Sequence, residues 1–150
     1  MITQARAKEI IEYARQLKSY WHTNDPYDLA TIYGYQVSER ESCYPGFTAQ
    51  IVGIEGYPTV ISINKAYTAF SKRILCAHEL GHAFFHSTDT CNHFSVSEKS
   101  IDSNTEQEAN LFAVALLTDN LINNRINVPL EKMSNYMLKS IIDYNLELET

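Results

Sequence analysis

Two histidines and a glutamate near the middle of the chain have the types and spacing to hold and use a metal ion. The sequence there is His78-Glu79-Leu80-Gly81-His82, and residues four apart in an α-helix differ by about 400° of rotation and one turn of rise. Both imidazoles can therefore bind one ion. Glu79 follows the first of them and can take a proton from water beside the ion. Apolar residues around the histidines predict the required helix, over residues 66–85.

A catalytic zinc ion is held by three protein ligands, so a third is required. A third ligand His two turns later, preceded by Gly, would occupy positions 88 and 85, where the chain has Thr88 and Phe85. This excludes the metzincin pattern. His86 lies a further turn along the helix, about 6 Å beyond His82. It is too distant to share an ion with His78, and we expect it to flank the site or cap the helix.

A second helix can supply the third ligand, as in gluzincins. Glu106 and Asn110 are one helical turn apart, so a carboxylate ligand and an amide that orients a ligand histidine would face the same way. Glu108 is rotated by about 200° from Glu106, so both cannot point at the ion. Because Thr105 and Glu108 match a capping box, we expect Glu108 to cap the helix. Glu106 is therefore the favoured ligand.

A different third ligand, Cys43, remains an alternative. Glu41-Ser42-Cys43 weakly resembles the Glu-Gly-Cys element of peptide deformylases, which hold their metal with a cysteine and the same pair of histidines. The glycine-rich element that those enzymes carry upstream has no counterpart here. Glu106 is favoured over Cys43 for this reason.

The elements around the motif predict an α+β fold, in which a small antiparallel sheet packs against a helical bundle containing the active-site helix. Caps and apolar spacing predict one helix over 3–20 with Thr3 as its N-cap, and a short second helix opened by Asp25 and Pro26. Period-two patterns predict three strands, over 35–38, 47–52 and 59–63. A polar stretch over 87–104 predicts a loop. Two further helices are expected, from Thr105 and from Pro129.

Length and composition favour one globular domain over residues 1–150. The chain has 150 residues, 45% of them hydrophobic and 20% charged, within the range of globular proteins. No apolar run approaches the roughly 20 residues that span a bilayer, and no apolar segment follows Met1 as in a signal peptide. The three cysteines form no C-x-x-C pair, which favours reduced thiols. We therefore expect a cytoplasmic protein without a membrane partner.

The charge distribution disfavours direct binding to nucleic acid. The formal net charge is −6, and the whole acidic surplus lies in residues 87–150. Nucleic-acid-binding proteins need a basic surface to displace counterions from phosphates. An acidic surface could instead attract a basic protein partner.

Residues in both predicted helices resemble those of the ImmA/IrrE (DUF955) metallopeptidases. The similar positions are Ala77–His82, His86, Glu106, Ala109-Asn110, Phe112-Ala113 and Leu116-Leu117. One departure is Thr118-Asp119, where the family usually has Met-Pro. The resemblance implies Zn²⁺ as cofactor, with His78, His82 and Glu106 as its ligands and Glu79 as the general base.

The same resemblance implies a protein substrate. Several members cleave a helix-turn-helix repressor, so we expect a zinc-dependent, site-specific anti-repressor endopeptidase of a phage or mobile element. The alternative is a metal-binding regulatory module that acts on a repressor by binding alone, without proteolysis. Replacing Glu79 by Gln distinguishes the two, because it removes the base and leaves the ligands.

Overall fold

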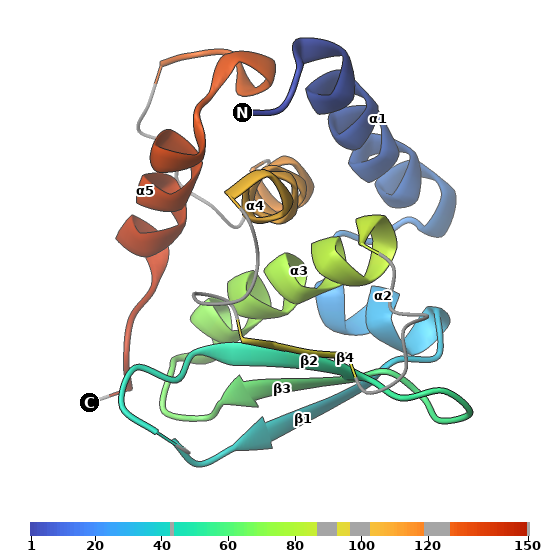
Figure 1. Ribbon diagram of the computed structural model, residues 1–150, viewed down its shortest axis with the longest axis vertical. Helices are drawn as coiled ribbons and strands as arrows, with labels where there is room; N and C mark the ends of the chain where they lie inside the picture. Colours follow the sequence, from blue (N-terminus) through green and yellow to red (C-terminus); the bar gives the residue numbers. More distant parts are fainter. Residues whose placement is uncertain (43, 87–92, 97–102, 119–126, 150) are drawn as a thin grey trace.

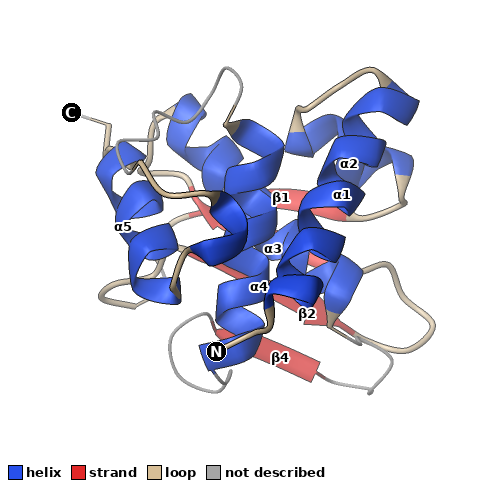
Figure 2. Cartoon of the chain, turned by 90° about the horizontal axis from the view of Figure 1, so that it is seen from above, coloured by secondary structure: helices blue, strands red, loops and turns tan. Residues whose placement is uncertain are grey.

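The computed structural model describes residues 1–42, 44–86, 93–96, 103–118 and 127–149. Its helices lie on one side of a small sheet, and α4 lies between α1 and α5 and over α3 (Figure 1). Viewed from above, the helices cross over the strands (Figure 2). The predicted α+β class is confirmed. The helices are α1 (Gln4–Trp21), α2 (Pro26–Ile32), α3 (Ala69–Phe85), α4 (Ser103–Leu117) and α5 (Asn135–Asn145), with a 3-10 turn η1 (Leu130–Lys132).

The first two helices begin where their capping residues predict. Thr3 accepts a hydrogen bond from the backbone N–H of Arg6, which satisfies a free donor at the start of α1. Asp25 does the same for Tyr27, and Pro26 opens α2. The buried face of α1 consists of Ala7, Ile10, Ala14 and Leu17. These apolar residues place α1 against the core and leave its charged residues outside.

The sheet has four strands in the order β1-β3-β2-β4, with β1 (Gln36–Arg40), β2 (Ala49–Gly53), β3 (Val60–Asn64) and β4 (His93–Val96). The predicted hairpin is confirmed, since β2 and β3 are antiparallel with Ile51 opposite Ile61. The prediction of a wholly antiparallel sheet is wrong, because β1 pairs parallel to β3. The chain passes from β1 to β2 before β3 fills the position between them. Strand β4 lies within residues 87–104, for which only a loop was expected.

The helix with the metal-binding motif is the centre of the fold. Thr68 caps α3 by accepting from the backbone N–H of Ser71, so the helix begins three residues later than predicted. Its middle is buried from Ile74 to His82, between the sheet and α4. The close packing of α3 on α4 depends on Gly81. A Cβ atom there would lie 2.9 Å from Ala109 Cα, nearer than two such atoms can approach.

The C-terminal segment completes the helical layer with a break in it. The single helix expected from Pro129 is instead the short turn η1 followed by α5, which has Ser134 as its N-cap. Leu138 and Ile141 of α5 join the core formed by the helices and by β2 and β3. Among the described residues, no helix has the length and apolar composition to cross a membrane.

Candidate metal centre

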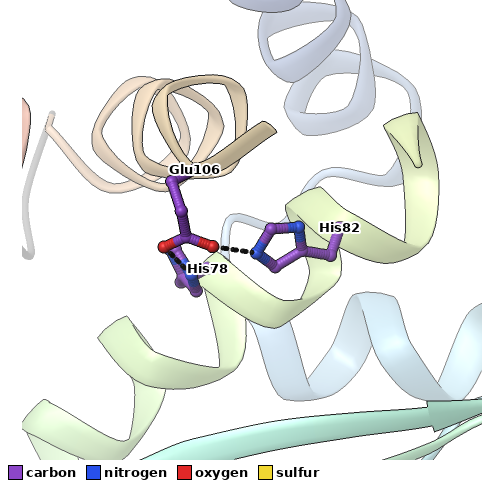
Figure 3. Close-up of side chains that lie close together, drawn as sticks. All are labelled: His78, His82 and Glu106. Atoms are coloured by element: carbon purple, nitrogen blue, oxygen red, sulfur yellow. Dashed lines mark hydrogen bonds and ion pairs between the residues drawn. The ribbon is translucent and has the colours of Figure 1, made fainter. Parts of the chain in front are cut away.

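Three of the predicted site residues meet where α4 crosses α3. Glu106 reaches from α4 towards His78 and His82 on α3 (Figure 3). Its carboxylate lies 2.9 Å from Nε2 of His82 and 3.5 Å from Nε2 of His78. One ligand atom from each of the three residues lies within 4.8 Å of the other two. The three side chains thus form a compact set of two nitrogen donors and one oxygen donor.

This donor set suits a divalent metal ion such as zinc. Two imidazoles and one carboxylate are a common ligand set of catalytic zinc, which keeps its fourth position open. Nε2 of His78 is buried and has no hydrogen-bond partner, an arrangement that costs free energy unless something binds there. An ion between the three side chains would satisfy this nitrogen and would offset the negative charge of Glu106.

The electrostatics of the three side chains keep the carboxylate ionised. Burial alone would raise the pKa of Glu106, but its contacts with His78 and His82 outweigh burial and lower the pKa to about 2. Burial lowers the pKa of His82 to about 4, so that its ring is neutral at pH 7 and can offer a lone pair. Burial acts the same way on His78, but Glu106 and the charge of Glu79 outweigh it and raise the pKa.

A cavity of about 270 Å³ opens beside the three side chains. His78, Glu79, Glu106 and Asn110 form its polar wall, so the carboxylate of the motif faces the same space as two of the candidate ligands. His82 is not among the described residues that line it. Water or a peptide in this cavity would therefore meet Glu79 and the His78 side of the centre.

The rest of the cavity lining comes mainly from α5 and its C-cap residue Leu146. Leu75, Ile142 and Leu146 provide apolar surface. Lys139 and Asp143 form an ion pair one turn apart, with 3.0 Å between Nζ and Oδ2, and both also line the cavity. The space beside the centre thus has an apolar part and a charged part.

Asn110 lies where the sequence predicts, one turn after Glu106. It lies close enough to His78 to help raise the pKa of that ring. Its Nδ2 donates to Oδ1 of Asn135 at 2.8 Å, so the first residue of α5 holds the amide. This arrangement can fix the orientation of the His78 ring.

Glu108 does not cap its helix, so that prediction is wrong. Helix α4 begins at Ser103, and Thr105 therefore lies inside the first turn. The Glu108 carboxylate instead accepts hydrogen bonds from Nε and Nη2 of Arg6, at 2.9 and 3.2 Å. It also lies 3.0 Å from Nε2 of His86. His86 is the C-cap residue of α3, and its Nδ1 lies 2.8 Å from Nδ1 of His82.

The competing ligand Cys43 lies outside the described residues. Cys76, on α3, is fully buried, and burial raises the pKa of its thiol. A neutral thiol in the core is neither a metal ligand nor a nucleophile.

Two residues that shape the surroundings of the centre were missed by the sequence reasoning. Nothing in the sequence singled out Arg6, which binds the Glu108 carboxylate next to the centre. Gly81 was read as part of the motif, although its missing side chain allows α4 to approach α3 closely enough for Glu106 to reach the histidines. A glycine in a helix interior costs about 1 kcal/mol relative to alanine, and this cost was the available signal.

A helix carrying His-Glu-x-x-His, with a carboxylate from the next helix completing the donor set, defines a metallopeptidase type of site. Residues 36–122 match the family model Peptidase_M78, described as the IrrE N-terminal-like domain. The chain belongs to this metallopeptidase family. The match begins at β1 and includes α3 and α4, whereas α1, α2 and α5 lie outside it. No curated protein matches the chain.

Proposed function

We propose that this protein is a zinc-dependent endopeptidase that cleaves a helix-turn-helix repressor of a phage or mobile element. The observation that carries the proposal is the cluster of His78, His82 and Glu106, with donor atoms within 4.8 Å, beside a cavity that Glu79 also lines. The family supports a protein substrate. A cytoplasmic location and a single domain over residues 1–150 are part of this proposal.

His78, His82 and Glu106 would hold the zinc ion. When bound, the ion would polarise the scissile carbonyl and lower the pKa of water at its open position. Glu79 would take the proton from the attacking water and then deliver it to the leaving amine. Glu79 is only 1% exposed, so few solvent molecules compete for this proton. Asn110 would keep the His78 ring in the orientation that directs Nε2 towards the ion.

The substrate class is proposed from the family resemblance and from charge. Helix-turn-helix repressors carry a basic surface for DNA. The acidic surplus in residues 87–150 would attract such a partner. The apolar wall at Leu75, Ile142 and Leu146 would accept an apolar side chain next to the cleaved bond.

The test combines purified protein, Zn²⁺ and the purified repressor encoded beside this gene. We expect two defined fragments, identified by mass spectrometry. Glu79→Gln is expected to abolish cleavage while zinc binding persists. Glu55→Gln makes the same chemical change in the exposed turn between β2 and β3 and is expected to cleave normally.

A reporter gene under the repressor separates cleavage from simple binding. Wild-type protein should relieve repression and Glu79→Gln should not. Full relief by Glu79→Gln, with the repressor intact, would overturn the peptidase proposal in favour of regulation by binding.

A further inference from the structure

A continuous row of polar contacts leads from the metal centre to the N-terminal helix. His82 contacts His86 at 2.8 Å, His86 contacts Glu108 at 3.0 Å, and Glu108 accepts two hydrogen bonds from Arg6. These residues come from α3, α4 and α1. Each contact has the length of a good hydrogen bond. The side chains of His86 and Glu108 are only 18% and 14% exposed, so water competes weakly for these contacts.

The number of N–H protons on the rings of His82 and His86 determines which of these contacts can be hydrogen bonds at the same time. The three contacts that His82 and His86 make with Glu106, with each other and with Glu108 need three N–H donors, since a carboxylate only accepts. Two neutral imidazoles carry two protons. A metal ion bound to Nε2 of His82 would replace the contact between that nitrogen and Glu106, so a third N–H donor would no longer be needed. His82 Nδ1–H then donates to His86 Nδ1, and His86 Nε2–H donates to Glu108.

Arg6 holds the outer end of the row in place. Two of its nitrogens bind the two oxygens of Glu108, a paired geometry that fixes both groups. The guanidinium also lies over the ring of Phe85, 5.4 Å from its centroid. Arg6 lies outside the residues that match the family model, so helix α1 contributes a group that the matched segment lacks.

We propose that His86, Glu108 and Arg6 are positioning residues that orient His82 and strengthen its bond to the metal ion. The inference rests on the proposed metal site and does not depend on the identity of the substrate. A histidine ligand whose second nitrogen donates to a fixed acceptor keeps one tautomer and one ring orientation. Loss of such a partner commonly weakens metal binding by about 10- to 100-fold.

The experiment measures Zn²⁺ affinity by competition with a chromophoric chelator, using the full chain. His86→Phe keeps a ring of similar size and removes both nitrogens, and we expect about 10- to 100-fold weaker binding. His86→Gln retains a donor and an acceptor and should recover part of the loss. Glu108→Gln and Arg6→Gln should show smaller losses, in that order. Arg15→Gln, which removes an exposed partner of Glu12 on the same helix, should leave the affinity unchanged.

Two further measurements distinguish positioning from a general effect on folding. The visible spectrum of the Co²⁺-substituted protein should change in His86→Phe, because the ligand field at His82 changes, and should not change in Arg15→Gln. The melting temperature of each metal-free variant gives its intrinsic stability. Should His86→Phe fail to fold, Glu108→Gln carries the same test.

The outcomes separate this inference from the proposed function. If wild-type protein binds no Zn²⁺, both are wrong. If wild-type protein binds Zn²⁺ and His86→Phe binds within twofold of it with the same Co²⁺ spectrum, only the positioning role is wrong. The positioning role would also be wrong if, across the variants, the loss of Zn²⁺ affinity were proportional to the loss of stability of the metal-free protein.

Discussion

The two histidines of the motif have different surroundings, although they belong to one helix and share one carboxylate. His82 lies between Glu106 and His86, and the contacts continue from His86 to α4 and α1. His78 lines the cavity, and its Nε2 has no hydrogen-bond partner. His82 lies one turn beyond His78 and therefore near the C-terminal end of α3. The first turns of α4 and of α1 also lie at this end, because Glu108 and Arg6 reach it.

This difference divides the centre into a fixed side and an open side. On the His82 side, charged and polar groups from three helices leave little freedom to the ring. On the His78 side, α5 contributes to the lining of a cavity in which a peptide could lie. A metallopeptidase site needs both properties, because the ligands must be preorganised while one position stays accessible. The following variants test each side in turn.

The largest effect is expected from Glu106→Gln, which changes the group common to both sides. The amide is a weaker, neutral ligand, and the negative charge between His78 and His82 is lost. We expect Zn²⁺ affinity to fall by more than about 100-fold, beyond the range for partners that only orient a ligand, and cleavage to disappear. Equilibrium dialysis with metal analysis measures the first effect. Affinity within tenfold of wild type would show that Glu106 is not a ligand.

Gly81→Ala should disturb the two sides together. In an exposed helix this change stabilises by about 1 kcal/mol, but here the new Cβ would meet Ala109 Cα at 2.9 Å. Because the two nearest atoms, Cα and O of Ala109, belong to the backbone, the helices must separate, at a cost of about 1–3 kcal/mol. We expect a lower melting temperature of the metal-free protein and weaker Zn²⁺ binding. Unchanged stability would mean that α4 can shift without loss.

The sequence predicted the parts of this molecule that depend on local chemistry. Thr3 and Asp25 mark the starts of their helices because a capping side chain binds backbone two or three residues away. The spacing of His78 and His82 predicted a common face, which the structure confirms. The sequence also predicted that Glu106 lies near the two histidines, because it begins the next helical segment along the chain.

The parts that were missed depend on contacts between distant segments. Strand β1 pairs parallel to β3 because of the path that the chain takes between the strands. The residue pattern of Gln36–Arg40 does not predict the direction of this pairing. Glu108 was assigned to a local cap because its partners Arg6 and His86 are far away in the sequence. Strand β4 was not predicted because residues 87–104 are mostly polar. It is held by backbone pairing with β2, a distant segment of the chain.

On the open side, Leu146→Trp should reduce catalysis without affecting the metal. Leu146 is partly buried and lines the cavity, so the larger ring would occupy space that the substrate needs. We expect kcat/KM to fall by about tenfold, the lower end of the roughly 10- to 200-fold range for a change of one methylene group in an apolar pocket, at unchanged Zn²⁺ affinity. Leu148→Trp, at a side chain that is 59% exposed and outside the cavity lining, is the matched control. Equal losses in both variants would contradict a substrate role for the cavity.

The smallest effect is expected from Lys139→Met at the charged part of the cavity. The pair with Asp143 is exposed, and pairs of this kind contribute less than about 0.5 kcal/mol, so the melting temperature should hardly change. Loss of the cation leaves Asp143 to face a basic substrate alone, which should lower KM by about two- to threefold at low salt, an effect that screening removes near 0.5 M salt. The value of kcat should stay the same, because Lys139 lies on α5, whereas the candidate ligands and Glu79 lie on α3 and α4. An equal change in kcat would instead place Lys139 next to the reacting carbonyl, and the open side would then contribute to the chemistry as well as to binding.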